Sequence, residues 1–192
     1  MDYGLKGKNA VITGASSGLG HAIAETFAAE GANLLTFARR AELLEKHAEG
    51  LRSRYGVTVE SVAGDMRDRE SIARLAEAAD AMPGGPDVLI LNTGRPPGKM
   101  QEVLDERDDE RWETAYRVQL WGGVQIVQAI APRLVAKGWG RIVAVTSASV
   151  KQPMLKHGLQ EMHASKIVLP GWAANRPNRD YLQERFAKFL AA

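Results

Sequence analysis

A glycine-rich turn between a short apolar segment and a helical pattern is the feature that most constrains how this chain can fold. The turn reads Thr13-Gly14-Ala15-Ser16-Ser17-Gly18-Leu19-Gly20 and follows the apolar residues 10–12. Strand, glycine-rich turn and helix in this order are typical of a dinucleotide site. Glycines let the backbone approach a pyrophosphate without a Cβ clash, and free N–H groups at the helix start stabilise its charge. The pattern predicts a nicotinamide dinucleotide held by Gly14, Ser16, Ser17, Gly18, Leu19 and Gly20.

Strand-like and helix-like segments continue to alternate along the chain, which indicates parallel βαβ units. The expected strands are residues 9–13, 33–37, 58–63, 88–91 and 141–146. The expected helices are residues 18–30, 41–55, 68–81 and 109–137, and Pro132 should bend or break the last one. The sequence therefore predicts an α/β Rossmann fold: one domain over residues 1–192, with a doubly wound parallel sheet of five to six strands in three αβα layers.

The composition narrows the possible functions. The 192 residues carry a net charge of +2 without a lysine/arginine block, so nothing argues for a nucleic-acid partner. The absence of cysteine excludes disulfides, thiolate catalysis and cysteine metal sites, and we expect no metal site. No apolar run is long enough to span a membrane, and the first residues lack the apolar stretch of a signal peptide. We therefore expect a cytoplasmic protein without a membrane partner.

Five landmarks follow one another between residues 5 and 150. They are the spacing Thr13-Gly14-x-x-x-Gly18-x-Gly20, Gly64-Asp65-Met66, Asn92-Thr93-Gly94, the pair Trp112 and Gln119, and the segment 140–147 that ends in Ser147. In this order they resemble the short-chain dehydrogenase/reductase family. Segments 92–98 and 149–153 are similar to a divergent subgroup related to β-ketoacyl-carrier-protein reductases, which often departs from the usual catalytic residues. The resemblance implies an oxidoreductase that acts on a small-molecule carbonyl or alcohol.

The resemblance also implies cofactor-site residues after the third and fourth strands: Asp65 and Met66, then Asn92, Thr93 and Gly94. Asp65 would contact the adenine, and the Asn92 segment would support the cofactor site. Both have a structural alternative. An aspartate before a helix is a frequent N-cap, a role that Asp68 could take instead of Asp65. Asn92 could simply satisfy buried backbone groups at a strand end.

The end of the second strand predicts which nicotinamide cofactor binds. The run Thr36-Phe37-Ala38-Arg39-Arg40 has alanine where a carboxylate would accept hydrogen bonds from the adenosine ribose of NAD. An arginine offers a planar fork of donors suited to a 2′-phosphate. We expect NADP(H) to be preferred over NAD(H), with Arg39 the main ligand and Arg40 its neighbour. The alternative is that both arginines are solvated residues at a helix start.

The sequence departs from the family pattern at the catalytic residues. The resemblance implies Ser147 at the substrate oxygen, Lys166 at the nicotinamide ribose, and Gln119 in place of an asparagine that holds a relay water. The family's proton donor is a tyrosine four residues before the lysine. The tyrosines of this chain are Tyr3, Tyr55, Tyr116 and Tyr181, and none lies in the expected interval after Ser147. One alignment puts Met162 at the tyrosine and keeps Lys166, while another puts Gln160 at the tyrosine and Ala164 at the lysine. Neither Met162 nor Gln160 can supply the proton near neutral pH.

Three other side chains could replace the tyrosine, but each has a structural explanation. His163 fits an outward polar residue of a short helix, Tyr181 lies in a terminal amphipathic stretch, and His21 fits a helix start. The chain after Lys166 is shorter than full-length relatives need. Either residues 167–169 form a sixth strand after a compressed crossover, or residues 141–146 form an exposed edge strand.

Three functions remain open at this point. The chain could be an NADP(H)-dependent oxidoreductase, a dinucleotide-binding protein without turnover (a sensor or a noncatalytic subunit), or a shortened or engineered relative that keeps only the fold. Assembly as a homodimer through the long helix is the expected oligomeric state.

Overall fold

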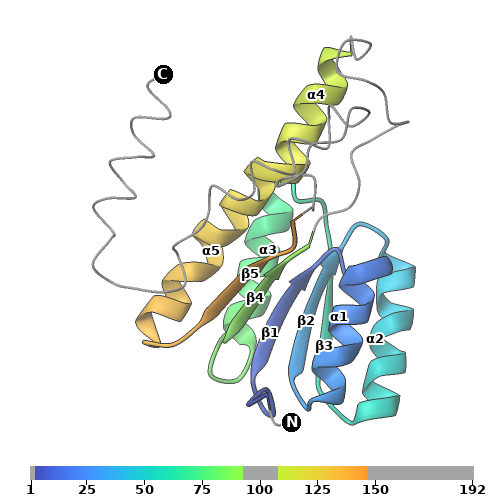
Figure 1. The fold of residues 1–192 in the computed structure, drawn as a ribbon, viewed down its shortest axis with the longest axis vertical. Coiled ribbons are helices and arrows are strands. Elements are labelled where there is room, and N and C mark those ends of the chain that lie inside the picture. The colour runs from blue at the N-terminus through green and yellow to red at the C-terminus, as the bar shows by residue number, and fades with distance from the viewer. Residues whose placement is uncertain (1–2, 93–107, 147–192) are drawn as a thin grey trace.

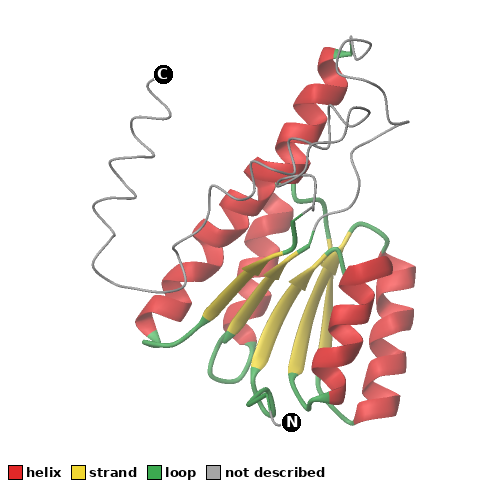
Figure 2. Cartoon of the chain, viewed as in Figure 1, coloured by secondary structure: helices red, strands yellow, loops and turns green. Residues whose placement is uncertain are grey.

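The core of the molecule is a five-stranded parallel sheet. The structure is a computed structural model that describes residues 3–92 and 108–146. The strands are β1 (Asn9–Thr13), β2 (Asn33–Ala38), β3 (Val59–Ala63), β4 (Val88–Leu91) and β5 (Arg141–Ala144). They lie in the order β3-β2-β1-β4-β5, and all their arrows point the same way (Figure 2). The predicted doubly wound parallel sheet is confirmed.

The strand order changes direction beside β1. The chain moves outward from β1 to β2 and β3, then returns to the other side of β1 with β4 and β5. The register pairs Ala10 with Leu34 of β2 and with Val88 of β4. Such a reversal leaves a crevice outside the carboxyl ends of the strands, where open α/β sheets bind their ligands. The carboxyl ends of β1 and β4 therefore mark the expected binding site (Figure 1).

Helices cover both faces of the sheet. Helices α1 (Gly18–Ala29) and α2 (Ala41–Tyr55) share one apolar core with β1, β2 and β4, including Ile12, Leu34 and Leu44. Helices α3 (Arg69–Ala81) and α5 (Gly122–Ala136) share the other core with the opposite faces of these strands. Because both faces are buried, β1 is buried at every position, as its apolar sequence predicts. Within the described ranges, every helix is too short or too polar to cross a bilayer.

The main difference from the prediction concerns the long helix expected over residues 109–137. The structure has α4 (Asp109–Tyr116), a π-helical segment η1 (Arg117–Trp121) and then α5, which continues through Pro132. The ring of Pro132 is exposed, so it costs one backbone hydrogen bond without ending the helix. Strands β1 and β4 and helix α2 have the predicted bounds, and the other elements differ by one or two residues, as for β5, which ends at Ala144 rather than residue 146. The predicted strand 167–169 lies outside the described residues.

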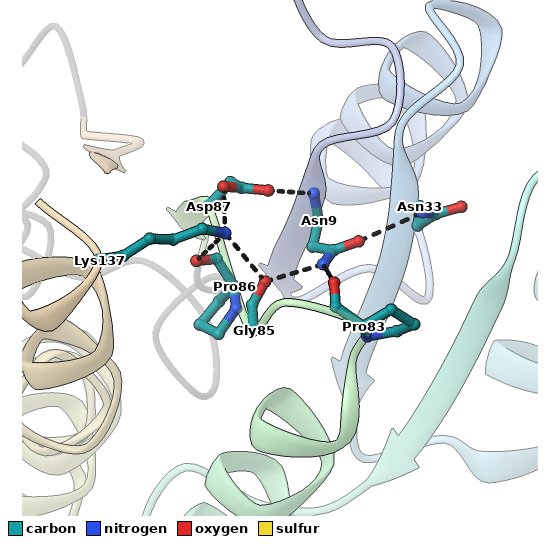
Figure 3. A network of polar contacts seen from close by, with 7 residues as sticks. All are labelled: Asn9, Asn33, Pro83, Gly85, Pro86, Asp87 and Lys137. Carbon is teal, nitrogen blue, oxygen red and sulfur yellow. Dashed lines mark hydrogen bonds and ion pairs between the residues drawn. The ribbon is translucent and has the colours of Figure 1, made fainter. Parts of the chain in front are cut away.

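A polar network ties the amino ends of β1 and β4 together, at the opposite edge from the expected site (Figure 3). The Asn9 backbone N–H donates to the buried Asp87 carboxylate at 2.9 Å, and the Asn9 side chain donates to the carbonyls of Pro83 and Gly85. Lys137, the residue after α5, donates to the same carboxylate. This edge is thus held by charge-assisted contacts among β1, β4 and α5.

Candidate dinucleotide-binding site

Four segments meet at the carboxyl edge of the sheet. The glycine-rich turn follows β1, Arg39 and Arg40 follow β2, Asp65 follows β3 and Asn92 follows β4. Parallel strands bring all four segments to one edge because their carboxyl ends align. The structure therefore gathers the described part of the predicted cofactor site in one region.

Asn92 fixes the turn to the neighbouring strand. The Thr13 hydroxyl donates to the Asn92 carbonyl at 2.9 Å and accepts from the Asn92 N–H at 2.9 Å. A Cβ at Gly14 would lie 2.4 Å from the Asn92 carbonyl oxygen, and one at Gly20 would lie 2.2 Å from the Gly14 oxygen and 2.7 Å from the Asn92 amide nitrogen. Only glycine allows this packing. The Thr13 hydroxyl thus satisfies the buried backbone of Asn92, and the Asn92 side-chain amide lies beside the two close glycines of the turn. A role of the Asn92 side chain in satisfying backbone groups stays a prediction.

The start of α1 is open to an anion. Ser17 is the N-cap of α1, yet among the described residues no side chain accepts a hydrogen bond from the first N–H groups of this helix. Helix α3, in contrast, is capped by Asp68. Gly18 has a φ of 56° and open space around its Cβ position. An exposed, uncapped helix start with a left-handed glycine beside it suits a phosphate, because the N–H groups and the helix dipole both favour negative charge.

Arg40 lies against this turn. Its Nη2 donates to the Ser16 hydroxyl at 3.1 Å and to the Ser17 hydroxyl at 2.6 Å. Arg39 is exposed, and its charge acts on the Asp65 carboxylate. The two arginines therefore face different parts of the site: Arg40 faces the turn after β1, and Arg39 is close enough to influence the segment after β3.

Asp65 is held by its neighbour Arg67. The Arg67 backbone N–H donates to Asp65 Oδ1 at 2.9 Å, and its guanidinium bonds to both carboxylate oxygens. Partial burial raises the pKa of Asp65, but the hydrogen bonds from Arg67 and the charges of Arg67 and Arg39 outweigh it and lower the pKa below the ordinary value. Asp68 caps α3 by accepting from the N–H groups of Glu70 and Ser71. The N-cap role thus falls to Asp68 and not to Asp65.

Gln119 is the described member of the expected catalytic set. It is buried, 1% exposed, within the π-helical segment. Single π-helical turns often occur at functional sites. Just after this segment, a Cβ at Gly122 would lie 2.5 Å from the carbonyl oxygen of the buried Met66. The helix that carries Gln119 therefore packs directly on the segment that follows Asp65.

Several predicted residues lie outside the described ranges. They are Thr93, Gly94, Ser147 and Lys166, with the alternatives Gln160, Met162, His163, Ala164 and Tyr181. Their roles stay predictions.

A stacked pair of histidines joins α1 and α2 and was not expected from the sequence. The rings of His21 and His47 have centroids 3.9 Å apart and an interplanar angle of 29°. The Nδ1 atom of each ring is buried without a hydrogen-bond partner among the described residues. Nothing in the sequence signals this contact, because 26 positions and two different helices separate the residues. The contact between Arg67 and Asp65, in contrast, could have been predicted from the sequence, because an aspartate often accepts a hydrogen bond from the backbone N–H two residues later.

Comparison with known proteins adds independent findings. A family model described as short chain dehydrogenase matches residues 8–174. The chain is 33% identical over 156 residues to the uncharacterized oxidoreductase YvrD of Bacillus subtilis (strain 168), covering 80% of this chain and 56% of that protein. It is 30% identical over 147 residues to the 3-oxoacyl-[acyl-carrier-protein] reductase FabG of Aquifex aeolicus (strain VF5), covering 77% of this chain and 58% of that protein.

Among solved structures, the chain is similar to L-sorbose reductase from Gluconobacter frateurii complexed with NADPH and L-sorbose. The TM-score is 0.81 and the identity is 33%, over 88% of this chain and 63% of that chain. The chain therefore spans less than two thirds of each of these three proteins.

Proposed function

The chain belongs to the short-chain dehydrogenase family, and on that premise we propose that it is an NADP(H)-dependent oxidoreductase acting on a carbonyl or alcohol substrate. The observation that carries the proposal is the uncapped start of α1, which faces open space at Gly18 beside the Arg40 guanidinium. A bound dinucleotide would supply or accept the hydride. The turn from Gly14 to Gly20 would hold its pyrophosphate, and Asp65 with Met66 would hold its adenine.

The preference for NADP(H) rests on Arg40. Its Nη2 is within 3.1 Å of both serine hydroxyls of the turn, so a 2′-phosphate in this region would meet a guanidinium and two hydroxyl donors. We propose Arg40 as the closer ligand and Arg39 as its neighbour on the side of Asp65, a reversal of the order expected from the sequence. The similar L-sorbose reductase in complex with NADPH supports the same cofactor.

The chemistry on the substrate would come from residues of the expected catalytic set. Ser147 would orient the substrate oxygen, Lys166 would hold the nicotinamide ribose, and Gln119 would hold a water that carries the proton. General acid–base catalysis needs a donor close to the reacting oxygen. We expect water or a nonstandard side chain to supply this proton in place of the missing tyrosine. Assembly as a homodimer through α4 and α5 is the oligomeric state we propose.

A second function, dinucleotide binding without turnover, is favoured by the tyrosine positions. Tyr55 ends α2, and its hydroxyl bonds to Glu25 on α1. Tyr116 ends α4, three residues before Gln119. Neither Tyr55 nor Tyr116 follows Ser147 in the sequence, where the family places its tyrosine. A sensor or noncatalytic subunit would keep the cofactor site and lack the proton donor.

Titration with NADPH and NADH, followed by nicotinamide fluorescence, tests the cofactor site. We expect saturable binding with NADPH tighter than NADH. We expect Arg40→Ala to weaken NADPH binding about ten- to a hundredfold, the range for loss of a charge-assisted contact, and to leave NADH unchanged. Arg39→Ala is the matched control and should have a smaller effect on the NADPH/NADH ratio. Absence of binding by the wild type would overturn the proposal, and equal affinities of the wild type for NADPH and NADH would overturn the NADP(H) preference. An unchanged ratio in both variants would overturn the assignment of that preference to the two arginines.

Turnover separates the two functions. NADPH oxidation would be followed with a panel that contains L-sorbose and a 3-oxoacyl thioester, because similar proteins act on or bind such carbonyls. Oxidation that is lost in Ser147→Ala while NADPH binding is kept would support the oxidoreductase. Tight NADPH binding without oxidation of any carbonyl would support the noncatalytic protein.

A further inference from the structure

The Asp65 carboxylate has an unusually complete set of contacts from a single neighbour. Arg67 Nε lies 3.1 Å from both carboxylate oxygens, Nη2 lies 2.7 Å from Oδ2, and the Arg67 backbone N–H lies 2.9 Å from Oδ1. A planar guanidinium that grips both oxygens fixes the rotation of a carboxylate as well as its position. Asp65 therefore presents its remaining acceptor positions in one fixed direction.

The pair lies where the adenosine half of a dinucleotide would reach. The backbone N–H of Gly64, just before Asp65, donates to the carbonyl of Ala38 at the end of β2. A Cβ at Gly64 would lie 2.7 Å from the ring of Phe37. The segment after β3 is thus packed against the end of β2, next to the arginines that follow it. With the pyrophosphate on the turn after β1, the adenosine extends toward β2 and β3.

We propose that Arg67 is a positioning residue that makes this site selective for a 6-amino purine over a 6-oxo purine; the inference rests on the proposed dinucleotide site. An ionised carboxylate only accepts hydrogen bonds. Adenine offers its 6-amino donor at this position. Hypoxanthine offers a carbonyl oxygen there and carries its donor on the adjacent ring nitrogen N1. A fixed carboxylate repels the oxo group, whereas a free one can turn toward N1–H and accept from it.

The charge around Asp65 supports the same role. Arg67 and Arg39 both act on this carboxylate, and together they hold its pKa below the ordinary value against the effect of partial burial. Asp65 thus stays an acceptor across the working pH range. Sites that pair a fixed polar group with a substrate donor reject an analogue that lacks the donor, because the site group is left unpaired.

Equilibrium titration of the full chain with NADPH and with reduced nicotinamide hypoxanthine dinucleotide phosphate tests the inference. The two probes differ only in the 6-amino or 6-oxo group of the purine and in the hydrogen on the adjacent N1. We expect the wild type to prefer NADPH about tenfold, the effect expected when a partly exposed carboxylate loses one charge-assisted hydrogen bond. Arg67→Ala should reduce this ratio to within about threefold, mainly by improving the relative binding of the hypoxanthine probe. Arg67→Lys keeps the charge without the fork, so its ratio should also fall.

Arg69→Ala is the matched control, since Arg69 is an exposed arginine two positions further along the chain. It should keep the wild-type ratio. A ratio that is unchanged in Arg67→Ala, or restored in Arg67→Lys, would overturn the positioning role while the dinucleotide site stands. A wild type that binds NADPH and the hypoxanthine probe equally would also overturn it. Failure of the wild type to bind either probe would instead overturn the proposed function on which the inference rests.

Discussion

The hydroxyl of Thr13 and the backbone of Asn92 form a reciprocal pair of hydrogen bonds, each 2.9 Å long. Thr13 ends β1 and Asn92 follows β4, so the pair joins the two strands at the point where the sheet order reverses. Both residues are buried. Because the Asn92 side chain packs against Gly14 and Gly20, this pair holds the glycine-rich turn in place.

We expect Thr13→Val to destabilise the fold by about 1–3 kcal/mol, because it leaves the buried N–H of Asn92 without a partner. The variant should also bind the dinucleotide more weakly, since Asn92 supports the turn. Chemical denaturation and NADPH titration measure the two effects. Thr13→Ser keeps the hydroxyl and should keep NADPH affinity. A Thr13→Val protein as stable as the wild type would contradict the role of this pair.

Two glycines should respond in opposite ways to alanine. In Gly20→Ala the new Cβ would lie 2.2 Å from the Gly14 carbonyl oxygen, so we expect a loss of about 1–3 kcal/mol and of NADPH binding. Gly50 lies inside α2 with nothing within 4 Å of its Cβ position, and its φ is helical. Gly50→Ala should therefore stabilise the protein by about 0.5–1 kcal/mol. Denaturant midpoints compare the two variants, and destabilisation by Gly50→Ala would show that the helix interior is not as open as described.

The sequence predicted the sheet well because its strands are short, apolar and buried on both faces. Short apolar runs such as β1 and β4 have few structural alternatives to a buried strand when regular helical segments lie between them. The prediction failed where the geometry depends on tertiary packing. The π-helical segment Arg117–Trp121 has no local sequence signal. Pro132 was expected to bend or break the helix, but α5 continues through this residue, which is exposed.

In the candidate site, too, the features set by local sequence were predicted, and those set by tertiary packing were not. The glycine spacing predicted the turn, since few residues other than glycine fit the close approach of Gly14 and Gly20 to Asn92. Whether Arg39 or Arg40 faces the turn depends on side-chain direction at the start of α2, which the order of residues does not determine. The stacking of His21 on His47 depends on how α1 packs against α2, so it became visible only in three dimensions.

The opposite edge of the sheet allows a test of a buried charge. Lys137 donates to the Asp87 carboxylate, whose side chain is 6% exposed (Figure 3). Lys137→Met should destabilise the fold by about 1–3 kcal/mol, because it leaves a buried carboxylate without its cation. In a double-mutant cycle, adding Asp87→Asn should cost less in the Lys137→Met background than in the wild type, as measured by chemical denaturation. Additive losses would mean that the two side chains do not interact energetically.

The histidine pair predicts how stability depends on pH. Burial lowers the pKa of His47 below its ordinary value of 6.5, and the nearby groups His21, Lys46 and Arg40 lower it further. The unfolded chain therefore takes up a proton on His47 at a higher pH than the folded protein does. As the pH falls below about 6.5, the unfolded state binds more protons, so the free energy of unfolding decreases.

The contribution of His47 to the slope of the free energy of unfolding against pH corresponds to the uptake of at most one proton. His47→Gln should remove it, so the stability of this variant should fall less than that of the wild type between pH 7 and pH 5. Urea denaturation at a series of pH values gives the comparison. Equal slopes for the wild type and His47→Gln would mean that the stacked pair does not resist protonation.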